Sequence, residues 1–168
     1  PSERKGFDFF PEIAGLLDDE NTHLIWVGGG GARDGYISWV ENRISSLRSR
    51  TRIHLAGRQK EKYDQYLHAA DGFILTSRQD PFPLVMIEAA ALGKPIVSFP
   101  SGGVSELMIE GMGSVTEDIS PKQMALEMKK IMNGEIVCDP AVSRQRMAEY
   151  DISKGMEAWN RVMDQVAW

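Results

Sequence analysis

Two carboxylates lie eight positions apart in the segment SRQDPFPLVMIEAAALGKPIV, which covers residues 77–97. Glu88 lies inside an otherwise apolar run, and Asp80 comes just before two prolines. A buried acid destabilises a protein unless something binds it, so both side chains are candidates for ligand contacts. The sequence also allows simpler roles, because Glu88 could be a solvated residue on a narrow polar stripe and Asp80 could cap a turn.

A helix is predicted immediately after these prolines. Proline disfavours the helical conformation in the residue before it, so we expect Phe82 to be extended and Pro83 to be the first helical residue. The amides of Leu84 and Val85 then have no intrahelical acceptor, and with the helix dipole they form a site for an anion such as phosphate. Glu88 follows one to two turns later, where a carboxylate could accept hydrogen bonds from two adjacent ribose hydroxyls. Because the helix is apolar nearly all round, we expect it to be buried.

Strand-like and helical segments alternate after a charged, loop-like opening stretch. The sequence predicts strands at 23–31, 52–57, 72–77, 95–99 and 113–117 and helices at 36–47, 62–70, 84–92, 104–109, 121–133, 141–149 and 153–166. This alternation is typical of an α/β fold with a mainly parallel sheet. Ligands of such sheets bind beyond the carboxyl ends of the strands, and three of these ends carry suggestive residues, at 28–31, 77–85 and 101–103.

The composition indicates one ordinary globular domain and excludes several classes of protein. The chain has 168 residues, of which 42% are hydrophobic and 26% charged. A formal net charge of −5 argues against bulk nucleic-acid binding, and the basic clusters around Arg50 and Arg58 indicate solvated surface. The single Cys138 excludes an internal disulfide and a cysteine-rich metal site. The single cysteine fits a reducing cytoplasm, where we expect the protein to lie. No apolar run approaches the roughly 20 residues of a transmembrane helix.

The segment 77–97 resembles the signature of the retaining GT-B glycosyltransferases of family 4, in which an acid, seven residues and a glutamate precede an apolar helix and Gly-Lys-Pro. Other stretches resemble this family in the same order: RKG at 4–6, LIWVGGG at 24–30, IHLAGR at 53–58, YLHAADGFILTS at 66–77 and SGGVSELM at 101–108. The resemblance implies one half of a GT-B fold, a Rossmann-like doubly wound parallel sheet with helices on both faces. It also implies that the chain is the C-terminal, donor-binding domain of a glycosyltransferase that acts in glycan biosynthesis.

Partners follow from the same resemblance. The donor would be a nucleotide diphospho-sugar such as a UDP- or GDP-sugar, and no cofactor is expected. The helices from about 141 to 168 resemble the segment that crosses back to an N-terminal acceptor domain. We expect that acceptor domain, and the first strand of this domain, to lie outside residues 1–168, so that the isolated chain would bind donor without efficient transfer. Peripheral membrane contact through the acceptor domain would be compatible with a cytoplasmic enzyme.

The resemblance assigns roles to individual residues by position. Glu88 would hold the ribose hydroxyls, and Lys5 would neutralise the diphosphate. Asp80, in a position where the family usually has glutamate, would lie near the donor sugar, so that Asp80 and Lys5 are the expected catalytic residues. The other expected contacts with the nucleotide-sugar are Phe82, the amides of Leu84 and Val85, the close-approach glycines Gly28 and Gly30, and Gly57 and Arg58 beside the base.

The chemistry expected of these residues is stabilisation of a departing diphosphate. Transfer breaks the bond between the anomeric carbon and the phosphate oxygen, so preorganised donors aimed at the phosphate charge should contribute most. Lys5 would supply a point charge and the helix-start amides would supply fixed dipoles. The family transfers sugar with retention and without a metal, and this sequence contains no Asp-x-Asp motif that would hold one.

Three other functions are compatible with parts of the sequence. The glycines at 28–31 suggest a nicotinamide-binding oxidoreductase, but Arg33 follows where that fingerprint requires Gly or Ala. Asp80 and Glu88 could be the carboxyl pair of a glycosidase, although an adjacent anion site suits a phosphate better. A GT-B-like module could also bind a nucleotide without transferring sugar, because Asp80 and Pro83 both depart from the family pattern.

Overall fold

The computed structural model describes residues 3–29 and 35–166. Five short strands are connected by helices along the chain, and every strand pair within these residues is parallel. The strands are β1 (His23–Val27), β2 (Arg52–Gly57), β3 (Phe73–Leu75), β4 (Ile96–Ser98) and β5 (Gly113–Val115). All five fall within the segments that the sequence predicts.

The strands form two sheets, whereas a single sheet was expected. One sheet has the order β1-β2, and the other has the order β3-β4-β5. The three residues of β4 are all buried, while β2 has exposed residues along its length. The α/β class and the parallel arrangement are therefore confirmed, but the described strands are not joined into one continuous sheet.

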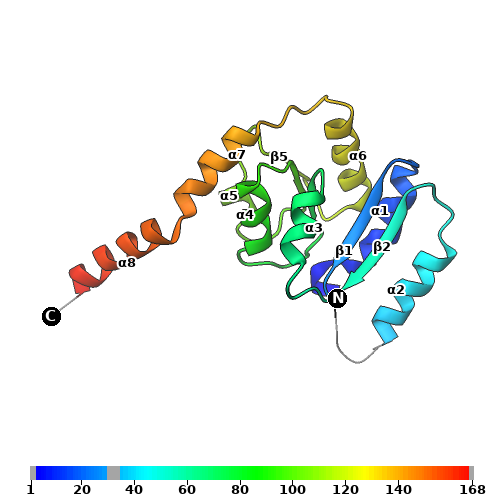
Figure 1. The fold of residues 1–168 in the computed structure, drawn as a ribbon, viewed down its shortest axis with the longest axis horizontal. Helices are drawn as coiled ribbons and strands as arrows, with labels where there is room; N and C mark the ends of the chain where they lie inside the picture. Colours follow the sequence, from blue (N-terminus) through cyan, green and yellow to red (C-terminus); the bar gives the residue numbers. More distant parts are fainter. Residues whose placement is uncertain (1–2, 30–34, 167–168) are drawn as a thin grey trace.

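Helices follow the strands as predicted, with boundaries that differ by a few residues (Figure 1). They are α2 (Gly35–Ser46), α3 (Tyr63–Ala69), α4 (Leu84–Ala91), α5 (Val104–Leu107), α6 (Pro121–Met132), α7 (Pro140–Met147) and α8 (Ile152–Val166), with a 3-10 turn η3 (Ala148–Tyr150) before α8. The start of α6 shows why such boundaries are predictable. The Ser120 side chain accepts a hydrogen bond from the Gln123 amide at 3.3 Å, with Pro121 in the first helical position.

The opening stretch is helical, so the prediction of a charged loop was wrong. It contains the 3-10 turns η1 (Glu3–Lys5) and η2 (Phe7–Phe9) and the helix α1 (Phe10–Leu17). Apolar residues at positions 10, 13, 14 and 17 have helical spacing and are all buried in α1. That pattern was present in the sequence and could have predicted the helix.

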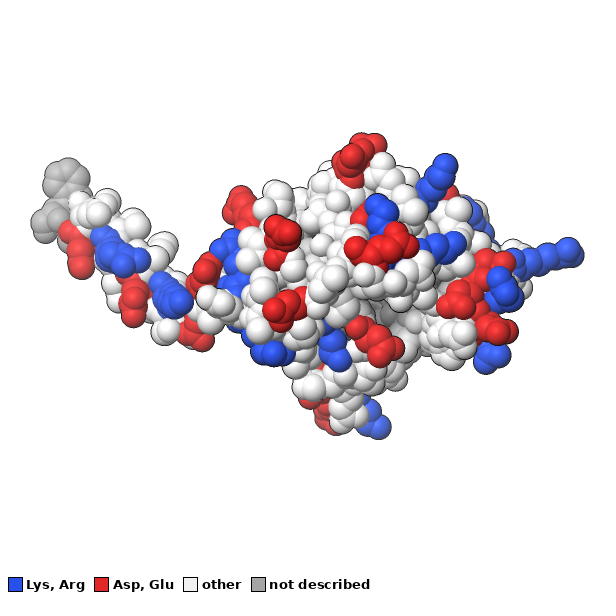
Figure 2. Space-filling model, turned by 90° about the horizontal axis from the view of Figure 1, so that it is seen from above, with Lys and Arg blue, Asp and Glu red and all other residues white. Residues whose placement is uncertain are grey.

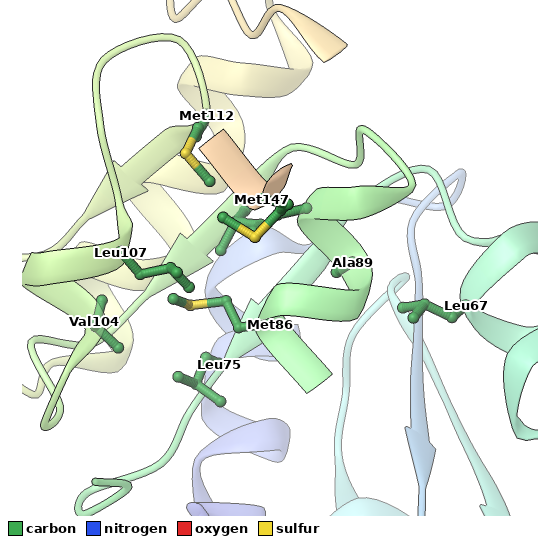
Figure 3. Close-up of a cluster of buried hydrophobic side chains, with 10 residues drawn as sticks. Leu67, Leu75, Met86, Ala89, Val104, Leu107, Met112 and Met147 are labelled. Atoms are coloured by element: carbon green, nitrogen blue, oxygen red, sulfur yellow. The ribbon is translucent and has the colours of Figure 1, made fainter. Parts of the chain in front are cut away.

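Two apolar clusters pack on opposite faces of the strands. Around α4, Met86 contacts the side chains of Leu75, Leu107 and Met147 (Figure 3). On the other face, α1 and α6 pack together over β1 and β4. Helices therefore cover both faces, as a doubly wound fold requires.

The last helix lies apart from this packed body. In Figure 1, α8 projects away from the strands, and all of its residues are exposed. The body that surrounds the strand ends is therefore built, among the described residues, from 3–29 and 35–150, and α8 contributes nothing to its core.

Candidate functional site

A large cavity opens between the two sheets. Its volume is ≈ 1160 Å³, and it is lined along one side by β1 and along the other by β3. Five of the residues predicted to contact a nucleotide-sugar lie around it: Lys5, Gly28, Leu84, Val85 and Glu88. These five residues follow the carboxyl ends of β1 and β3 or come from η1, so one end of the cavity is the place where ligands of parallel sheets bind.

Lys5 and Asp80, the two predicted catalytic residues, are in direct contact although 75 positions separate them. The Lys5 ammonium donates to a carboxylate oxygen of Asp80, and the Ser77 hydroxyl donates to the same oxygen at 3.5 Å. The Asp80 side chain is only 9% exposed, whereas that of Lys5 is 39% exposed and lines the cavity. Asp80 therefore does not line the cavity. It fixes the position of the ammonium group of Lys5, which does line the cavity.

Close backbone packing holds both residues of this pair. Gly6 follows Lys5 with φ +72°, and a Cβ at Gly6 would lie 1.9 Å from the carbonyl oxygen of Thr76. Gly102 packs in the same way on Asp80, since a Cβ there would lie 1.9 Å from the Asp80 carbonyl oxygen. A side chain at either glycine would thus force η1 or the loop at 101–103 away from the ion pair.

A second ion pair anchors η1 and η2 to the end of β3, and the sequence analysis missed it. The Arg78 guanidinium donates to both carboxylate oxygens of Asp8, at 2.8 and 2.6 Å, and lies 3.9 Å from the centre of the Phe9 ring. The Tyr36 hydroxyl also donates to Asp8, at 2.8 Å. Burial raises the pKa of Asp8, but the hydrogen bonds from Arg78 and Tyr36 and the charge of Arg78 outweigh it and hold the pKa below its usual value. No local pattern could have revealed this group, because its members come from three distant segments.

The start of α4 differs by one position from the prediction. Pro83 has φ −78° and ψ 95°, so it is the N-cap in extended conformation, and the helix begins at Leu84. The Pro83 carbonyl accepts from the amides of Met86 at 2.9 Å and Ile87 at 3.4 Å. The amides of Leu84 and Val85 still precede the first intrahelical bond, so the feature that matters for an anion is unchanged.

Glu88 is exposed and lines the cavity, so α4 is not buried on all sides as its apolar sequence predicted. The buried face of α4 is made by Met86, Ala89 and Ala90, while Leu84 and Glu88 lie on its open side. The Glu88 carboxylate accepts a hydrogen bond from the Tyr63 hydroxyl on α3. Burial and this contact with Glu88 raise the pKa of Tyr63. The carboxylate predicted to bind ribose hydroxyls thus already binds one hydroxyl group of the protein.

The residues predicted near the base are less enclosed. The Gly28 amide donates to the Gly57 carbonyl at 2.8 Å, which continues the pairing of β1 and β2 past an irregularity at Trp26 and Val27. Gly28 lines the cavity, but Gly57 and Arg58 are exposed and are not among the residues that line it.

Phe82, like Gly57 and Arg58, is a predicted contact residue that the structure does not bring to the cavity. Phe82 packs against the Tyr150 ring with 5.7 Å between ring centres and is not a lining residue. Gly30 lies outside the described residues. The structure therefore groups Lys5, Gly28, Leu84, Val85 and Glu88, and it places Phe82 elsewhere.

Comparison with known sequences identifies relatives over most of the chain. The family model described as glycosyl transferases group 1 matches residues 1–134. The chain is 30% identical over 150 residues to the lipopolysaccharide core biosynthesis glycosyltransferase LpsE of Rhizobium meliloti. The aligned region covers 88% of this chain and 40% of LpsE. It is 28% identical over 142 residues to the 2-deoxystreptamine N-acetyl-D-glucosaminyltransferase of Niallia circulans. That alignment covers 82% of this chain and 36% of the relative. The chain thus spans less than half the length of these relatives.

Solved structures share the fold at lower sequence identity. The Anabaena protein Alr3699/HepE, crystallised in complex with UDP, superposes with a TM-score of 0.80 at 21% identity, over 97% of this chain and 46% of that one. A glycosyltransferase from Rickettsia africae superposes with a TM-score of 0.84 at 15% identity, over 98% of this chain and 45% of its own. These likenesses concern the fold alone.

Proposed function

The chain belongs to the glycosyl transferases group 1 family, and we propose that it is the donor-binding domain of a GT-B glycosyltransferase whose substrate is a nucleotide diphospho-sugar. The observation that carries this proposal is the grouping of Lys5, the first amides of α4 and Glu88 around one cavity at the carboxyl ends of the strands. A cation, helix-start amides and a carboxylate match the diphosphate and the ribose of a nucleotide. The UDP complex of the fold relative Alr3699/HepE supports UDP as the first ligand to test.

The diphosphate would bind where positive charge is preorganised. The amides of Leu84 and Val85 would donate to the distal phosphate, and the Lys5 ammonium would approach the same charge from η1. Asp80 forms an ion pair with the Lys5 ammonium group. When a diphosphate arrives, the ammonium group would lie between the phosphate and Asp80, and Asp80 would keep it oriented while the leaving phosphate gains charge.

The ribose hydroxyls would bind to Glu88, which accepts a hydrogen bond from a protein hydroxyl group in this structure. Glu88 accepts the Tyr63 hydroxyl, and a carboxylate has acceptor capacity for two further hydroxyl groups. The ribose hydroxyls would therefore bind beside or in place of the Tyr63 hydroxyl. We also propose that transfer retains the anomeric configuration and needs no metal. Lys5 and the helix dipole would supply the positive charge that a metal would otherwise provide.

A glycosidase that uses Asp80 and Glu88 is disfavoured by the same geometry. Asp80 is buried against Lys5 and does not line the cavity, so the two carboxylates do not face a common substrate space. Glycoside hydrolysis requires both carboxyl groups to flank the scissile bond.

The acceptor site would come from a further domain that packs on α8. Apolar side chains recur at Ile152, Met156, Trp159 and Val162 with helical spacing, and each is more than half exposed. Acidic and basic side chains both lie along this helix in Figure 2, and its two basic residues are balanced by two acidic ones. A helix without net positive charge suits a protein surface better than an anionic lipid surface. Within residues 3–29 and 35–166, none of the helices combines the length and hydropathy needed to cross a bilayer.

Calorimetric titration with UDP and with GDP tests the proposed ribose contact. Hydrogen bonds to charged groups contribute about 1.5–3 kcal/mol each, so Glu88→Ala should weaken nucleotide binding by roughly tenfold to a hundredfold. Glu110→Ala is a matched control, because Glu110 is an exposed acid away from the cavity lining. Equal affinities of the wild type and Glu88→Ala would refute the role of Glu88.

Absence of sugar transfer by the isolated chain, with donor binding retained, is the expected result of an activity assay.

A further inference from the structure

The carboxylate proposed to bind the ribose is connected to a second helix of the cavity wall. Glu88 lies in the second turn of α4, and its carboxylate accepts a hydrogen bond from the hydroxyl of Tyr63, the first residue of α3. The two helices lie side by side (Figure 1), and both residues line the cavity. The Tyr63 hydroxyl therefore lies where a ribose would meet Glu88, and the sequence analysis did not single it out.

Tyr63 is well suited to hold another side chain in place. Its ring packs against the apolar cluster around α4 that contains Leu67 and Met86, so packing sets the position of its hydroxyl. A tyrosine side chain has few rotatable torsions and loses little conformational entropy when it is fixed. Burial and the contact with Glu88 raise the pKa of Tyr63, so its hydroxyl remains a hydrogen-bond donor at neutral pH and well above it.

Glu88 is a side chain that benefits from such a partner. It lies on the open side of α4 with Leu84, while Met86, Ala89 and Ala90 form the buried side. Glutamate is among the side chains that lose most rotamer entropy when they are fixed. A ligand that had to order Glu88 by itself would lose part of its binding free energy in doing so.

We propose that Tyr63 is a positioning residue of the nucleotide site and that its hydroxyl holds the Glu88 carboxylate in the orientation that two adjacent ribose hydroxyls require. This role rests on the proposed function, because it presupposes a nucleotide whose ribose lies on Glu88. Tyr63 acts through Glu88 and does not have to touch the reacting atoms. The ligand class that the arrangement selects is a ribonucleoside diphosphate over its deoxy analogues.

The carboxylate has room for the tyrosine and the ribose together. An ionised carboxylate has two oxygens with about four lone-pair sites, and the Tyr63 hydroxyl takes a site on one of these oxygens. Two ribose hydroxyls need two of the others. The Tyr63 hydroxyl would therefore stay in place when a ribose binds, and the ribose would bind beside it.

A nucleotide without ribose hydroxyls separates positioning from general support of the fold. 2′,3′-Dideoxyuridine diphosphate keeps the base and the diphosphate of UDP but offers Glu88 no hydroxyl group. If Tyr63 orients Glu88, its hydroxyl matters for the affinity of UDP and not for that of the dideoxy analogue. If Tyr63 only holds α3 against α4, its loss affects both ligands alike.

Calorimetric titration of the 168-residue chain with both ligands tests this role. We expect the wild type to bind UDP at least about tenfold more tightly than the dideoxy analogue, because the analogue makes no hydrogen bond to the carboxylate. Tyr63→Phe should weaken UDP binding by about three- to tenfold and change the affinity for the analogue by less than about twofold. Tyr66→Phe is the matched control and should change neither affinity, because Tyr66 lies on α3 and lines the same cavity, whereas the hydroxyl that Glu88 accepts is that of Tyr63.

A double-mutant cycle shows whether Tyr63 acts through Glu88. In the Glu88→Ala background, Tyr63→Phe should change UDP affinity by less than about twofold, since no carboxylate is left to orient. A loss as large as in the wild-type background would overturn the proposed role.

Two results with Tyr63→Phe alone would also overturn it. Equal losses for UDP and the dideoxy analogue would mean that the hydroxyl supports the helices and not the carboxylate, and unchanged or tighter UDP binding would mean that it competes with the ribose. In both cases a wild type that prefers UDP would leave the proposed donor site standing. A wild type that binds UDP no better than the analogue would instead contradict the ribose contact on Glu88, and the role of Tyr63 with it.

Discussion

The two ends of the proposed nucleotide site are built very differently. At the phosphate end, Lys5 is fixed by the buried Asp80 and by the hydroxyl of Thr76, in contacts that join residues more than 70 positions apart. At the base end, Gly57 and Arg58 follow the exposed strand β2. Preorganised charge can stabilise a diphosphate strongly, whereas exposed side chains contribute little. We therefore expect this chain to bind any nucleoside diphosphate mainly through its phosphates.

Substitution of Lys5 should have the largest effect. Lys5→Met removes the cation from the phosphate end and leaves Asp80 buried without its partner, so we expect UDP affinity to fall by roughly tenfold to a hundredfold. The free energy of unfolding should also fall by about 1–3 kcal/mol. Calorimetry and urea unfolding measure the two effects.

The neighbouring Arg4 provides the control for this substitution. Arg4 is exposed, and its guanidinium donates to the Gln79 carbonyl at 3.3 Å. Arg4→Met should change UDP affinity by less than about twofold. Equal losses in Lys5→Met and Arg4→Met would mean that general charge, and not the placed ammonium group, attracts the ligand.

The Arg78 anchor should have an intermediate, indirect effect. Arg78→Met would release Asp8 and loosen η1 and η2 from β3, so that Lys5 is held less well. We expect unfolding to become easier by about 1–3 kcal/mol and UDP affinity to fall several-fold. Arg78→Lys should recover part of the stability, because it keeps the charge but loses the paired geometry. If Arg78→Met is clearly destabilised but its affinity for UDP is unchanged, the ion pair between Arg78 and Asp8 does not help to position the binding site.

Acid should weaken the same anchor. The folded-state pKa of Asp8 is lowered, so its stabilisation is complete above the unfolded value of about 3.9 and is lost as the pH falls through the lower, folded value. Between pH 7 and pH 3, the urea midpoint should therefore fall more for the wild type than for Asp8→Asn. An identical fall in both proteins would contradict the proposed charge on Asp8.

Substitution at the base end should have the smallest effect. Arg58 is exposed and does not line the cavity, so Arg58→Ala should change the affinities for UDP and GDP by less than about twofold. A loss as large as that of Lys5→Met would contradict the comparison, because it would mean that the base end contributes as much to the affinity as the phosphate end.

The parts of the molecule that could be predicted from the sequence are those with local signals. Alternating apolar runs identify β3 and α4, and Pro83 predicts where α4 begins, although the helix starts one residue later. Ser120 and Pro121 likewise mark the start of α6.

The remainder depends on contacts between distant segments. The resemblance assigned Lys5 and Asp80 to one site, but nothing in their spacing indicated that they form an ion pair. The bond of Arg78 to Asp8 and the separation of β1 from β3 gave no sequence signal at all, because strand pairing and tertiary ion pairs have no fixed period.

A crystal structure of the chain with UDP would test the proposed donor site most directly. The expected result is a diphosphate within hydrogen-bonding distance of the Lys5 ammonium and of the amides of Leu84 and Val85, with the ribose hydroxyls on Glu88. UDP bound at another place, with Lys5 still paired only to Asp80 and Glu88 only to Tyr63, would contradict it.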